Sequence, residues 1–134
     1  MRSVLVDKIA SVALQADLGQ EIRVADEIPC EEGVLIVGSG LSYHNLRLFG
    51  PAGREPSAQF DAWLDKAVNA EPKTRIQELL RWEQAPAARV CHPREDHLVP
   101  LFAAVGAAEN EKARRVYHDT NVFGGVTASS YRFG

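Results

Sequence analysis

The sequence is poor in the features that mark secreted, membrane-spanning and disulfide-rich proteins. Two cysteines among 134 residues are too few for a disulfide framework, and neither belongs to a Cys-x-x-Cys pair. We therefore expect Cys30 and Cys91 to be free thiols in a reducing compartment. No apolar stretch reaches the roughly 18 residues that a membrane-spanning helix needs, and Asp7 and Lys8 break the apolar core that a signal peptide requires. These absences predict a cytoplasmic protein without a membrane partner.

Basic residues are too few for a nucleic-acid-binding surface. The chain has 15 Lys and Arg against 18 Asp and Glu, which gives a formal net charge of −3, and no basic stripe accompanies any predicted element. A length of 134 residues with 46% hydrophobic content can bury one modest core and leaves no room for a second domain. Repeats, linkers and low-complexity tracts are absent, so we predict a single domain over residues 1–134.

Histidine is also scarce, and the first of the four histidines follows a short apolar run. Residues 34–37 are Val-Leu-Ile-Val and lead into Gly38-Ser39-Gly40, which predicts a buried strand that leaves its sheet through a tight turn. With Ser42 as an N-cap, His44 would lie in the first turn of a helix, where open α/β sheets bind ligands and the helix dipole favours neutral imidazole. No Lys-Ser or Lys-Thr pair follows the glycines, so neither a phosphate loop nor a dinucleotide fingerprint is complete. The structural alternative is a core histidine bonded to a carbonyl group.

The second histidine-bearing motif is Cys-His-Pro-Arg-Glu-Asp-His-Leu-Val-Pro-Leu-Phe, residues 91–102. Pro93 and the acidic residues after it predict the start of a helix, with His97 at the rim of its apolar face and His92 in the extended entry segment. Imidazoles beside carboxylates are typical of a divalent metal site or of acid/base catalysis. The alternative is a charge cluster that complements the helix dipole.

The remaining sequence predicts a scaffold of helices and strands. Apolar residues at helical spacing predict helices over residues 7–24, over 57–70 with Ser57 at the start, and from Pro72 to a point before Pro86. Residues 50–53 are expected to form a loop, His118 to lie at a strand end or in a loop, and residues 126–133 to form a strand. This order predicts an α/β fold with a small mixed sheet flanked by helices.

Three stretches together carry a family resemblance: Gly-Ser-Gly-Leu-Ser-Tyr-His-Asn-Leu at 38–46, His-Pro-Arg-Glu-Asp-His-Leu-Val-Pro-Leu-Phe at 92–102, and Ser-Ser-Tyr-Arg-Phe-Gly at 129–134. In this order and spacing they resemble the class III extradiol ring-cleavage dioxygenases, the LigB/DOPA-dioxygenase-like family. The resemblance covers about residues 29–134, corresponds to the C-terminal half of the family domain, and implies its α/β sandwich. It also implies the opening of a catechol-type ring with molecular oxygen at non-haem Fe(II), which zinc often replaces in crystals.

The resemblance also implies roles for individual residues. His44 matches the histidine that acts as acid/base and lies near the metal, where some relatives have it as a ligand. His97 matches the C-terminal metal ligand, and Asp96 is a weaker candidate because other branches use a carboxylate there. His92 belongs to the motif without an assigned role and is another weaker candidate. We expect the side chains of His44 and His97 to converge on one cleft.

The two other metal ligands of the family are histidines in the N-terminal half of its domain, whereas no histidine precedes His44 in this sequence. We therefore expect the isolated chain to bind metal weakly and to need a homo-oligomer or a complementary subunit. The favoured function is an extradiol dioxygenase, or a truncated portion of one. The alternative is an inactive relative that serves as a binding or oligomerisation module. A zinc hydrolase is disfavoured because no His-Glu-x-x-His motif is present.

Overall fold

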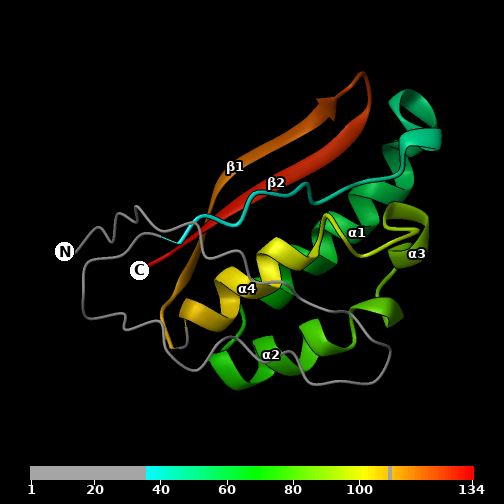
Figure 1. The fold of residues 1–134 in the computed structure, drawn as a ribbon. Helices are drawn as coiled ribbons and strands as arrows, with labels where there is room; N and C mark the ends of the chain where they lie inside the picture. The colour runs from blue at the N-terminus through cyan, green and yellow to red at the C-terminus, as the bar shows by residue number, and fades with distance from the viewer. Residues whose placement is uncertain (1–35, 109) are drawn as a thin grey trace.

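Helices pack against one side of a two-stranded hairpin (Figure 1). The structure, a computed structural model, describes residues 36–108 and 110–134. The helices are α1 (Arg54–Val68), α2 (Pro72–Leu80), α3 (Ala88–Cys91) and α4 (Val99–Ala108), with 3-10 helices at Leu46–Leu48, Gly50–Gly53 and Trp82–Gln84, and the strands are β1 (Ala113–Val122) and β2 (Val126–Phe133). The predicted α/β class is confirmed, although the sheet of the described residues is antiparallel and not mixed. None of the helices in these two ranges is long and apolar enough to cross a membrane.

The hairpin joins β1 to β2 through a tight turn. Phe123 and Gly124 both have positive φ, 52° and 82°, as reversal of the chain in so short a turn requires. The predicted strand over residues 126–133 is confirmed. The prediction for His118 was wrong, because this residue lies inside β1 opposite Ser129. Most of β1 is exposed on both faces, so its sequence lacks the apolar alternation by which a strand is usually predicted.

The segment over residues 36–50 runs beside β2, on the edge that β1 leaves free (Figure 1). The backbone N–H of Ser129 donates to the hydroxyl oxygen of Ser42 at 2.9 Å. Val34 and Leu35 of the predicted strand lie outside the described residues, as do the predicted helix over 7–24 and Cys30. Ile36 and Val37 are not in a strand, and Val37 is 72% exposed. The strand prediction is therefore wrong for these two residues, since within the described residues the backbone ladder joins β1 to β2 only, and the 36–42 segment is held to β2 through the side chain of Ser42.

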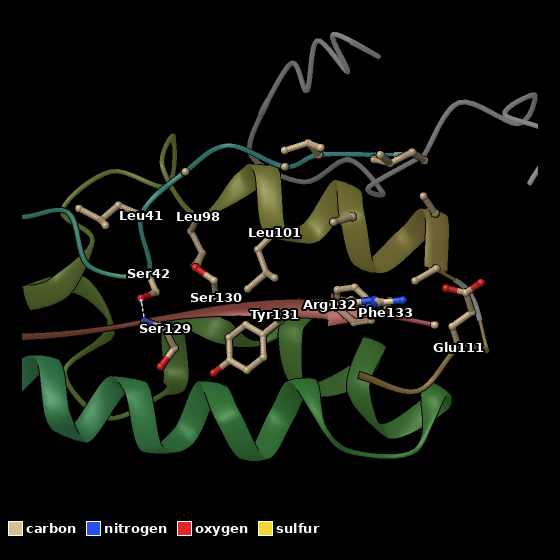
Figure 2. Close-up of a pocket in the computed structure, with 18 of the residues that line it drawn as sticks. Leu41, Ser42, Leu98, Leu101, Glu111, Ser129, Ser130, Tyr131, Arg132 and Phe133 are labelled. Atoms are coloured by element: carbon tan, nitrogen blue, oxygen red, sulfur yellow. Dashed lines mark hydrogen bonds between the residues drawn. The ribbon is translucent and has the colours of Figure 1, made fainter. Parts of the chain in front are cut away.

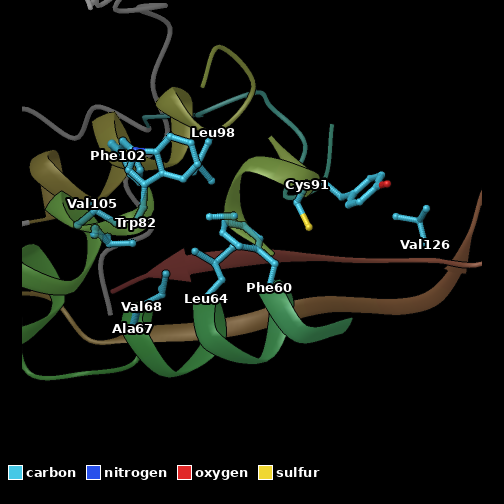
Figure 3. Packing of buried hydrophobic residues seen from close by; sticks show 13 residues of the cluster. Phe60, Leu64, Ala67, Val68, Trp82, Cys91, Leu98, Phe102, Val105 and Val126 are labelled. Carbon is cyan, nitrogen blue, oxygen red and sulfur yellow. The ribbon is translucent and has the colours of Figure 1, made fainter. Parts of the chain in front are cut away.

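Helix α1 supplies one half of the hydrophobic core. Phe60, Leu64 and Val68 are fully buried at helical spacing and pack beneath the apolar residues of the 82–105 region (Figure 3). The helix begins at Arg54, three residues before the predicted start. Ser57 is not its N-cap, since its hydroxyl accepts the backbone N–H of Thr127 at 2.9 Å and so ties α1 to β2. Residues 50–53, predicted as a loop, form the 3-10 helix that precedes α1.

Helix α2 begins at Pro72 as predicted, whereas α4 begins at Val99 and not at Pro93. The backbone N–H groups of Leu98 and Val99 both donate to the carbonyl oxygen of Glu95, at 2.8 and 3.0 Å. The Glu95 carboxylate pairs outward with Arg89 at 3.0 Å. The proline in the first turn is therefore Pro100, and the residues before Val99 form turns that place His97 just ahead of the helix.

Candidate functional site

The side chains of His44 and His97 lie against each other, which confirms the expected proximity but not a common cleft, because only His97 of the two lines the adjacent groove. Their ring centroids are 3.5 Å apart and the ring planes differ by 16°, so the imidazoles are stacked. Both side chains are partly exposed. His44 does not lie in the first turn of a helix, because the next helix begins at Leu46 and Asn45 caps it by accepting the N–H of Arg47. The expected influence of a helix dipole on His44 therefore has no structural basis.

Hydrogen bonds between two distant segments hold this pair together. The backbone N–H of His44 donates to the carbonyl oxygen of Cys91 at 3.0 Å, and that of Leu41 donates to the carbonyl oxygen of His97 at 3.2 Å. The side-chain amide of Asn45 donates to the Val90 carbonyl oxygen at 2.7 Å. The 41–45 segment is thus fixed along the 90–97 segment, which positions the two rings without any bond between them.

His92 is buried separately from the stacked pair. Its side chain is fully buried, and its Nε2 lies 3.0 Å from the carbonyl oxygen of Ser42. Burial lowers the pKa of His92 from 6.5 to about 4, against the opposite effect of the bond to Ser42. The ring is therefore neutral at pH 7. Its Nδ1 is buried without a hydrogen-bond partner in the described part of the chain.

These residues do not form a complete metal site. A metal ion binds an imidazole nitrogen in the ring plane at about 2.0–2.1 Å, and two nearly parallel stacked rings cannot both hold one ion in their planes. Within residues 36–108 and 110–134, no three His, Cys, Asp or Glu side chains are grouped to hold a metal ion. Asp96 is exposed and forms no ion pair with any other described residue. The described chain provides two adjacent imidazoles, which do not fit the facial set of ligands expected for iron.

A groove of about 480 Å³ lies between the 36–42 segment, α4 and β2, with His97 in its wall (Figure 2). Leu98 and Leu101 point into it toward β2, and Glu111 lies at its far end. His44 does not line the groove, so the groove meets the histidine pair through His97. Its volume is within the range of small-molecule sites.

A polar cluster that the sequence did not predict lies between α1 and the hairpin. The Nδ1 of His118 is 3.0 Å from the hydroxyl of Ser129 and 3.4 Å from the Asp61 carboxylate, and Arg115 lies 3.7 Å from the same carboxylate. Asp61 is buried although it lies on a helix whose sequence indicated an apolar core face. The cluster attaches the hairpin to α1. Its charged residues come from α1 and β1, and nothing in the sequence indicates that these two elements pack together.

Comparison with known proteins matches residues 5–134 to the family described as the catalytic LigB subunit of aromatic ring-opening dioxygenase. This match extends further toward the N-terminus than the resemblance over 29–134. A 4,5-DOPA dioxygenase extradiol of Beta vulgaris is 37% identical over 109 residues, covering 77% of this chain and 39% of that protein. Dioxygenase tasH of Hapsidospora irregularis is 33% identical over 116 residues, covering 77% of this chain and 35% of that protein. The chain thus spans less than half the length of these relatives.

The fold has a counterpart among solved structures. The crystal structure of the uncharacterized protein JW3007 from Escherichia coli K12 superimposes with a TM-score of 0.60 at 18% identity, covering 72% of this chain and 41% of that one. This likeness supports the α/β fold. Because the family match spans nearly the whole sequence, the chain belongs to the family of the catalytic LigB subunit of aromatic ring-opening dioxygenases.

Proposed function

We propose that this chain carries part of the active site of an extradiol ring-cleavage dioxygenase, with His44 and His97 at its centre. The observation that carries the proposal is the contact between them, with ring centroids 3.5 Å apart. Membership of a family of ring-opening dioxygenases supports the reaction class, in which molecular oxygen opens a catechol-type ring. The substrates are then an aromatic small molecule and oxygen.

His44 is assigned the acid/base role. Neutral imidazole accepts a proton near pH 7 and can return it later in the reaction. The backbone of His44 is fixed by its bond to Cys91, and one face of its ring is covered by His97. A group held in this way can take the proton of a catechol hydroxyl that is bound beside the histidine pair.

His97 is assigned the role of a nitrogen ligand for Fe(II), with zinc as a possible replacement. The family is generally metal-dependent, but only one ring of the stacked pair can hold a given ion in its plane, so His97 alone is an incomplete ligand set, and Asp96 and His92 remain weaker candidates. Because the described residues bring together only two adjacent imidazoles, the remaining ligands are proposed to come from a second copy of the chain or from a complementary subunit.

The test is an oxygen-consumption assay on protein loaded anaerobically with ferrous iron, with DOPA and protocatechuate as substrates. The chain is separated by size before the assay, so that monomer and assemblies are measured individually. We expect the monomer to bind iron weakly and to open neither ring, and activity to accompany an assembly that retains iron. Rapid ring opening by the monomer would refute the assignment of ligands to another chain.

Variants separate the two histidine roles. In an active assembly, His97→Ala should remove the iron, whereas His44→Ala should leave it bound and lower turnover by roughly 10²- to 10⁴-fold, as for loss of an acid/base group. His118→Gln is the matched control, since it changes a histidine outside the pair and should preserve both iron and turnover. Iron-replete assemblies that open neither substrate would count against dioxygenase activity.

The alternative function is an inactive relative that binds aromatic compounds or a partner. The incomplete ligand set of the described residues favours it. Calorimetric titration with 4-nitrocatechol distinguishes the two functions, because an inactive binding module should bind the catechol without iron and consume no oxygen in any assembly.

A further inference from the structure

His92 is enclosed by aromatic side chains that leave its ring little freedom. Its ring centroid lies 5.1 Å from that of Phe60, and the Trp82 ring meets it edge-on at 6.1 Å and 89°. A carbonyl oxygen only accepts hydrogen bonds, so the Nε2 that faces the Ser42 carbonyl carries the hydrogen and donates it. The aromatic side chains therefore fix the orientation of the His92 ring, and this orientation directs its Nε2–H toward the Ser42 carbonyl oxygen.

Ser42 is held from two directions at once. Its carbonyl oxygen accepts from His92 at 3.0 Å, and its hydroxyl oxygen accepts from the backbone of Ser129 in β2 at 2.9 Å. Ser42 lies two positions before His44, so its backbone determines how the chain enters the stacked pair. A displacement of Ser42 is carried directly to the His44 imidazole.

The bond from His92 lies between the two backbone bonds that join the segments. Leu41 is bonded to the His97 carbonyl and His44 to the Cys91 carbonyl, and Ser42 occupies the stretch between them. Without the bond from His92, the hydrogen bonds of Leu41 and His44 would join residues 41–44 to the 91–97 segment only at the two ends of this stretch. The side chain of His92 supplies the middle attachment from inside the core.

We propose that His92 is a positioning residue, which holds the Ser42 carbonyl so that the His44 imidazole lies stacked on His97. This inference deepens the proposed function and rests on it for the chemical purpose of the pair. The geometric effect, however, can be measured without metal, substrate or turnover.

The test uses NMR of the full chain with isotopically labelled histidine. Contact between the rings gives nuclear Overhauser effects between His44 and His97 and upfield ring-current shifts of their carbon-bound ring protons. His92→Gln places an amide nitrogen where Nε2 was, whereas His92→Asn places it where Nδ1 was. The two variants have the same chemistry, and only glutamine can reach the Ser42 carbonyl. His92→Phe keeps an aromatic ring in the core without a donor.

We expect His92→Gln to retain the inter-ring effects, and His92→Asn and His92→Phe to lose them while amide hydrogen exchange still reports a folded core. A residue that contributed only stability would change the unfolding midpoint and leave these signals intact in the folded protein. Folded asparagine or phenylalanine variants with unchanged inter-ring effects would overturn the proposal. If the phenylalanine variant does not fold, the glutamine and asparagine pair decides. Absence of dioxygenase activity would refute the proposed function and leave this result unaffected.

Discussion

The buried His92 should make the free energy of unfolding of the chain depend on pH. Burial lowers the pKa of its ring from 6.5 to about 4, so the unfolded chain takes up the proton first as the pH falls. The contribution of the neutral, buried His92 to the free energy of unfolding is therefore fully present above pH 6.5 and is lost progressively as the pH falls to about 4. Between pH 7.5 and 4.5, linkage gives a loss of about 2 to 3 kcal/mol in the free energy of unfolding from this group.

Urea unfolding followed by tryptophan fluorescence measures this loss at the two pH values. His92→Gln removes the titrating group and keeps a donor for Ser42, so its free energy of unfolding should fall by about 2 to 3 kcal/mol less than that of the wild type. His118→Gln is the control, since it removes a histidine whose side chain is 37% exposed. If the wild type and His92→Gln lose equal stability between the two pH values, the burial of a neutral His92 is not the cause.

Two further predictions concern the packing around the site. Gly53→Ala should lower the free energy of unfolding by about 1–3 kcal/mol, because a Cβ there would overlap the Leu48 carbonyl oxygen and lie 2.8 Å from the Tyr43 hydroxyl. An unchanged urea midpoint would contradict this packing. Cys91 should resist iodoacetamide at pH 8 in the folded chain and react in urea, because burial raises the pKa of its thiol to about 12. Peptide mass spectrometry detects the modification, and rapid labelling of Cys91 under native conditions would show that the thiol is accessible.

The elements that the sequence predicted best are those whose local signals agree with their packing. Helix α2 starts at its proline, and the apolar stripe of α1 is the buried face. The start of α4 was wrong because Pro93 and the acidic residues after it are local helix signals, whereas Glu95 pairs with Arg89 and its carbonyl oxygen closes a turn. Local propensity does not include such tertiary contacts.

The candidate site was predicted only in part, because some of its contacts are also tertiary contacts that local sequence signals do not include. The pairing of His44 with His97 followed from a family resemblance between motifs and not from helical periodicity. The contact of His92 with Ser42 spans 50 residues and is a side-chain bond to a backbone carbonyl, for which the sequence gives no signal. His118 was misplaced because β1 is a largely exposed strand, and its partner Asp61 lies on α1.

The bond between Ser42 and Ser129 joins residues 87 positions apart, which has a consequence for the order of folding. Closing so long a loop costs more chain entropy than forming the local contacts of α1 with α2, so the helical layer should gain structure before the histidine pair does. During synthesis on the ribosome, the hydroxyl of Ser42 lacks the hydrogen bond from Ser129 until β2 has emerged. The geometry around His44 is therefore completed only after residues 126–133 have been translated, and a nascent chain interrupted before them would contain both histidines without the strand that fixes them.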